Sequence, residues 1–158
     1  MSAFRLRKEA KSWFKDIYKG DGLEIDFDMY YFCLMAGIAS NAKDTTFQVS
    51  DTSELIDYFP TRYKDKSRII ISLFLSRELA GQGVTLTDKK SAHNHISQLI
   101  SPESQNYLSD NGVKLMNAYA YKGFEILIEW FTDRPRTLES FLGTYANKIS
   151  EMVKPIPI

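Results

Sequence analysis

Lysine and arginine gather in two stretches of the sequence, and these side chains offer the clearest chemistry. The candidate contacts are Arg5, Arg7, Lys8, Lys11 and Lys15 in the first stretch and Arg62, Lys64, Lys66 and Arg68 in the second. Ammonium and guanidinium groups hold phosphates by charge and hydrogen bonding without reading a base sequence. The two stretches therefore predict contacts to a nucleic-acid backbone, with duplex DNA as the expected ligand. The alternative is an ordinary charged helix face turned to water.

Other residues that could do chemistry lack a suitable spacing. His93 and His95 are the only histidines, and two residues apart on a helix they point to different sides, so no shared metal is expected. The acidic residues between the basic stretches have no basic neighbour in the sequence, and helix capping explains them. They are Asp21, Glu24, Asp26 and Asp28. We expect no metal, no cofactor and no catalytic residue, although an enzyme with unrecognised chemistry stays open.

Length, composition and charge set limits on the kind of protein. The chain has 158 residues, 44% hydrophobic and 25% charged, which is typical of one globular domain spanning residues 1–158. Its 20 basic residues balance 20 acidic ones, so any nucleic-acid contact must come from a local patch. A single cysteine, no recognisable leader and no apolar run of about 20 residues predict a cytoplasmic protein without a membrane segment.

The segment FDMYYFCLMAGIAS, residues 27–40, is the most apolar part of the chain. Its apolar positions run almost all round a helix, which is typical of a helix enclosed by neighbours. We expect a core helix, capped by Asp26 and ending near Gly37. Cys33 then behaves as a small buried hydrophobe and is a poor nucleophile.

Apolar periodicity and capping residues predict an all-α or mainly α fold, a compact single-domain bundle of seven or eight helices. Residues 4–7 are either one short N-terminal strand or the start of the first helix. Residues 69–71 are strand-like, but the length of their segment favours helix. Expected helices lie at about 6–18, 27–40, 51–59, 66–80, 88–100, a segment opened by 101–102, 110–132 and 138–153.

Two helices could also contact a protein partner. Ala118, Ala120 and Gly123 would let another helix approach the segment 119–131 closely, although core packing is the expected use. The alternative function is therefore a helical protein–protein adaptor without nucleic-acid contact. It would use apolar surface left on residues 119–131 or 138–152.

Three segments carry a resemblance to a known family. They are residues 4–10 (FRLRKEA), residues 22–23 leading into 33–38 (CLMAGI), and residues 117–124 (NAYAYKGF). Together, over about half the chain, they resemble the DndE family, small proteins associated with DNA phosphorothioate modification. Family members look shorter, and where they carry His and Arg this sequence has Tyr121 and Lys122.

The resemblance implies a non-catalytic, oligomeric accessory protein that favours duplex DNA and contacts it through lysines. Together with the basic stretches, it leads to a working hypothesis: a helical accessory subunit that binds the DNA backbone in a modification or defence system. Its partners would be duplex DNA and other proteins of that system, and a homo-oligomer is left open.

Overall fold

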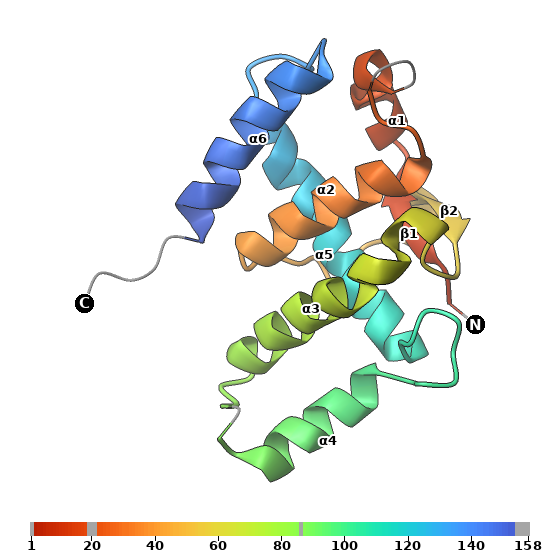
Figure 1. Ribbon diagram of the computed structural model, residues 1–158, viewed down its shortest axis with the longest axis vertical. Helices are drawn as coiled ribbons and strands as arrows, with labels where there is room; N and C mark the ends of the chain where they lie inside the picture. The colour runs from red at the N-terminus through yellow and green to blue at the C-terminus, as the bar shows by residue number, and fades with distance from the viewer. Residues whose placement is uncertain (1, 19–21, 86, 154–158) are drawn as a thin grey trace.

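The computed structural model describes residues 2–18, 22–85 and 87–153, so Asp21 of the acidic run lies outside the described residues (Figure 1). This part of the chain is mainly helical, with six α-helices and one two-stranded sheet, slightly fewer helices than expected. The strands are β1 (Phe4–Arg7) and β2 (Thr52–Ile56). The α-helices are α1 (Ala10–Trp13), α2 (Asp26–Ala39), α3 (Ser67–Gly81), α4 (Lys89–Leu99), α5 (Asp110–Glu129) and α6 (Leu138–Met152). Short 3₁₀ turns are η1 (Lys15–Ile17), η2 (Val49–Asp51) and η3 (Thr61–Lys66).

Helices α2 and α5 cross at the centre of the molecule, and the other elements pack around this pair (Figure 1). The core helix expected within residues 27–40 is confirmed as α2, and Met29, Tyr30 and Cys33 are fully buried. On α5, Met116 and Leu127 are equally buried. Both helices therefore contribute to a single hydrophobic core.

Two glycines allow the backbones of α2 and α5 to touch. A Cβ atom placed on Gly123 would lie 1.8 Å from the carbonyl oxygen of Cys33, and one on Gly37 would lie 2.2 Å from that of Tyr119. No side chain fits into either space. Gly37 was expected to end the core helix, which is wrong: the helix continues to Ala39, and the glycine serves this contact.

The N-terminal strand is present, and the helix expected at 6–18 is reduced to the single turn of α1 and the short 3₁₀ turn η1. β1 pairs antiparallel with β2, with Arg5 opposite Glu54 and Arg7 opposite Thr52. Phe4 and Leu6 are buried between half-buried arginines, so the two-residue period of a strand prevails over the helical spacing. The amide of Asn117 on α5 accepts from the Arg5 N–H and donates to the Ala3 carbonyl, which fixes β1 against α5.

Two other expected helices are absent. Residues 51–59 form η2 and β2 instead, because Thr52 is buried and its neighbours pair with β1. Residues 101–106 form a tight connection, in which the Ser101 N–H donates to the Tyr107 carbonyl. Asn106 is fully buried there and accepts from the Leu108 N–H.

The remaining expected helices are confirmed as α3, α4, α5 and α6. The strand-like residues 69–71 lie inside α3. Asp88, Ser109 and Thr137 each accept a backbone N–H at the start of α4, α5 and α6. None of the helices in the described ranges is both long and apolar enough to cross a membrane.

We expect Gly123→Ala to destabilise the protein strongly, by about 3 kcal/mol or more, because the added methyl group meets backbone rather than a movable side chain. The matched control is Gly143→Ala on α6, where an added Cβ meets nothing within 4 Å. There the higher helix propensity of alanine should raise stability by about 0.5–1 kcal/mol. Urea unfolding measures both changes. Equal stabilities of the two variants would contradict the backbone contact.

Candidate functional site

Arg5 belongs to the sheet rather than to an open basic surface. Its Nε atom donates to Thr52 Oγ1 at 2.8 Å, and its Nη1 atom lies 3.7 Å from a carboxylate oxygen of Glu54. The side chain is half-buried. These contacts hold β1 to β2, so Arg5 has little freedom to reach a phosphate.

Arg7 is the most enclosed of the nine predicted cations, with 17% of its side chain exposed. Its Nη1 atom donates to Glu125 Oε1 at 2.9 Å, and its guanidinium lies 4.4 Å from the ring centre of Tyr121. The Nε atom lies 3.4 Å from Glu9 Oε2 without a hydrogen bond. Arg7 therefore fastens β1 to α5 by an ion pair and a cation–π contact.

The two positions that depart from the DndE pattern take part in this same cluster. Tyr121 lies between the Arg7 guanidinium and the Phe47 ring, which stacks on it at 5.3 Å. Lys122 donates to Glu125 at 2.8 Å. Hydrogen bonds from Lys122 and Arg7 lower the pKa of Glu125, although burial acts in the opposite direction. The contacts of Tyr121 and Lys122 are structural ones.

The acidic segment of residues 24–28 lies between the two basic stretches. Asp26 Oδ2 is 3.4 Å from Lys11 Nζ of the first stretch, and Glu24 forms an ion pair with Arg62 of the second. The absence of a basic neighbour holds in the sequence but not in the fold. The segment therefore contacts both stretches and pairs with one cation from each.

The cap of α2 differs from the expected one. Asp28, and not Asp26, accepts the N–H groups of Glu24 and Ile25, and its other oxygen accepts from the Tyr63 hydroxyl. Asp26 accepts instead from the Tyr18 hydroxyl at 2.7 Å, which raises the pKa of Tyr18 to about 12 together with burial.

Seven of the nine predicted cations are exposed, and within the described ranges five of these seven have no carboxylate oxygen within 4.0 Å. They are Lys8, Lys15, Lys64, Lys66 and Arg68. They come from both basic stretches, which the contacts of residues 24–28 place on either side of that segment. Exposed and without such a partner, these five are the strongest candidates among the nine for contact with an external phosphate.

Lys64 and Arg68 line an open groove of about 750 Å³ between the start of α3 and the 100–107 connection. Asp65 and Tyr107 also line it, and Tyr107 is 52% exposed with a φ of 66°. A tyrosine rarely takes this left-handed conformation, so the connection holds its ring in the open. The sequence analysis did not single out Tyr107. Its neighbours in the sequence indicate neither the left-handed turn at this position nor the residues of α3 that line the same groove.

Cys33 and the two histidines belong to no cluster of metal-ligating side chains in the described residues. Cys33 is fully buried, and burial raises the pKa of its thiol. His93 is exposed and His95 half-buried on α4. Over the ranges that the structure describes, no group of three or more His, Cys, Asp or Glu side chains gathers as a metal site would require.

The two helices considered as partner surfaces differ. On α5, Tyr119, Phe124 and Leu127 are buried, so the apolar stripe of this helix belongs to the core. On α6, Leu142 and Met152 are exposed. Apolar surface for a protein partner is therefore left on α6 and not on this face of α5.

We expect the Glu125 cluster to make stability depend on pH. Because the folded state lowers the pKa of Glu125, its contribution is complete above the unfolded value of about 4.3 and is lost as the pH falls through the folded value. Glu125→Gln should lower the unfolding midpoint in urea at pH 7 and have a smaller effect at pH 3. The control Glu103→Gln removes an exposed carboxylate outside this cluster and should change little. A Glu125→Gln effect that grows toward pH 3 would contradict this role.

Comparison with models of protein families, with curated proteins and with solved structures returned no match to this chain.

Proposed function

We propose that this protein is a non-catalytic helical subunit that binds the phosphate backbone of duplex DNA in a DNA modification or defence system. The observation that carries the proposal is the set of five exposed cations without a carboxylate partner in the described ranges, with Lys64 and Arg68 in one open groove. Side chains of this kind contact phosphates without sequence preference. Because the net charge of the chain is zero, the contact must come from such local cations rather than from bulk charge.

The packing of the segments that resemble the DndE family supports the same proposal. Those segments fall on β1, α2 and α5, which pack against one another at the centre of the fold. Asn117 connects all three, because its amide also accepts from the Tyr30 hydroxyl of α2 at 2.8 Å. The three segments that carry the resemblance therefore belong to one packed unit of this chain.

The experiment is binding to a fluorescent duplex DNA over a salt series, with the mass of the protein in solution recorded alongside. We expect affinity to fall with salt, with a slope of about −0.9 for each phosphate neutralised. The variant Lys15→Gln, Lys64→Gln, Arg68→Gln should bind more weakly at every salt concentration and reduce the slope by about 3. Arg7 is kept, because its contacts hold α5.

The matched control removes three exposed lysines outside the two stretches, Lys89→Gln, Lys90→Gln and Lys114→Gln. It has the same net charge as the test variant, so bulk charge cannot account for a difference between them. Equal binding by both variants, or no binding by the natural protein at low salt, would contradict the proposal.

A further inference from the structure

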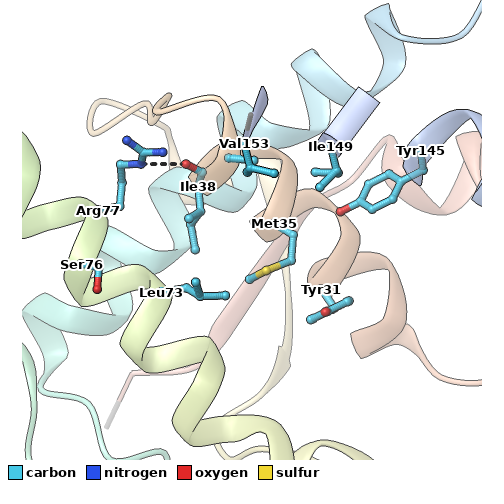
Figure 2. Close-up of a pocket in the computed structure, with 10 residues that line it drawn as sticks. Tyr31, Met35, Ile38, Leu73, Ser76, Arg77, Tyr145, Ile149 and Val153 are labelled. Atoms are coloured by element: carbon cyan, nitrogen blue, oxygen red, sulfur yellow. Dashed lines mark hydrogen bonds between the residues drawn. The ribbon is translucent and has the colours of Figure 1, made fainter. Parts of the chain in front are cut away.

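An apolar groove of about 440 Å³ runs between α2, α3 and α6 (Figure 2). Tyr31, Met35, Ile38 and Ala39 of α2 form its floor, Leu73, Ser76 and Arg77 of α3 one wall, and Tyr145, Ile149 and Val153 the other. Tyr145 is held in place by a hydrogen bond from its hydroxyl to the Phe32 carbonyl. The groove is thus lined by side chains that helices already fix, and it is separate from the Lys64 and Arg68 groove.

The lining follows helical spacing on each of the three helices. On α2 the floor residues Tyr31, Met35 and Ile38 recur at i, i+4 and i+7, a length of about 10 Å at a helical rise of 1.5 Å per residue. On α6, Ile149 and Val153 are four residues apart. Helices α2 and α6 therefore present apolar stripes to one trough about two turns long, and α3 adds Leu73 beside the polar Ser76 and Arg77. This is a shape into which a fourth helix packs.

The rim of the groove keeps large apolar side chains in water. Leu73 is 45% exposed, and Ile69 on the same helix and Val153 at the end of α6 are more exposed still. Contiguous apolar surface of this kind marks a contact site in soluble proteins. A helix laid in the groove would remove these side chains from water.

One charged side chain at an end of the groove indicates which charge the occupant should carry there. Arg77 is the one charged side chain lining this groove in the described part of the chain. Its Nε atom donates to the Ile38 carbonyl at 2.8 Å, and within the described ranges no carboxylate lies within 4.0 Å of its guanidinium (Figure 2). Its two Nη atoms remain to hold a carboxylate of the occupant.

We propose that this groove binds an amphipathic helix of a protein partner. That helix has apolar residues at i, i+4 and i+7 and an Asp or Glu that meets Arg77. The proposal does not rest on DNA binding, since the groove shares no lining residue with the groove of Lys64 and Arg68. It assigns the partner contact to α2, α3 and α6 together.

The probe is a synthetic, fluorescently labelled helical peptide of about 16 residues, long enough to form a helix. It carries leucines at i, i+4 and i+7 and one glutamate a turn away. Two companion peptides replace the leucines by alanine or the glutamate by lysine. We expect the leucine peptide to bind the full chain at least about tenfold more tightly than the alanine peptide, because its buried apolar area is larger.

Protein variants locate the binding. Leu73→Gln should weaken binding of the leucine peptide about tenfold, a loss typical of removing one large buried side chain. The matched control is Leu142→Gln on α6, which removes a leucine of similar exposure, 42%, outside the groove lining. Arg77→Gln should abolish the preference for the glutamate peptide over the lysine peptide. Circular dichroism of each variant checks that its fold is retained.

Several results would overturn the proposal. They are no binding of the leucine peptide, equal binding of the leucine and alanine peptides, or equal losses from Leu73→Gln and Leu142→Gln. A dimer that Leu73→Gln dissociates would assign the groove to a second copy of the chain. Binding that begins only when residues 154–158 are removed would assign it to that segment. None of these outcomes depends on the DNA measurement.

Discussion

The contact between the backbones of α2 and α5 is the constraint on which the rest of the fold depends. At Gly123 and Gly37 each helix presents bare backbone to a carbonyl oxygen of the other, so the two axes come closer than any side chain would allow. Large residues then fill the space on either side of the crossing. Phe4 of β1, for example, packs its ring on Phe27 and Tyr30 of α2.

This central pair also decides which cations are available. Asn117 sits on α5 beside the crossing and holds β1 through the backbone of Ala3 and Arg5. The strand in turn directs Arg7 onto the Tyr121 ring and Glu125. Cations near the core therefore serve the fold, and cations on η1, η3 and the start of α3 face solvent. The division does not follow position in either basic stretch, since Arg7 is enclosed and the next residue, Lys8, is exposed.

Capping residues and apolar spacing within each segment were sufficient to predict the longer helices. The caps Asp88, Ser109 and Thr137 and the helical spacing that follows each of them lie within a few residues, and the helices begin there. The Ser109 cap was not among the expected residues, although the helix start at Asp110 was. The second strand could not be predicted in this way. β2 depends on β1, about 45 residues earlier, and signals local to residues 51–59 predicted a helix there instead.

The sequence was sufficient to identify the cations of the candidate site, but not the carboxylate that each cation contacts. Which cations are neutralised depends on Glu24, Asp26, Glu54 and Glu125, and only the last is distant in sequence from both stretches. The apolar groove was not foreseen either. Its floor belongs to a helix expected to be enclosed on all sides. Most apolar residues of α2 are indeed buried, whereas Tyr31 and Met35, which line the groove, are partly exposed.

Cys33 gives the crossing a chemical reporter. It is the sole cysteine of the chain, its side chain is fully buried, and its carbonyl oxygen is the atom that Gly123 approaches. A thiol reagent can reach this sulfur only when the core around α2 opens, so the rate of alkylation under native conditions measures how often it opens. Compared with the free energy of complete unfolding, that rate separates local opening around α2 from global loss of structure, without introducing any label site.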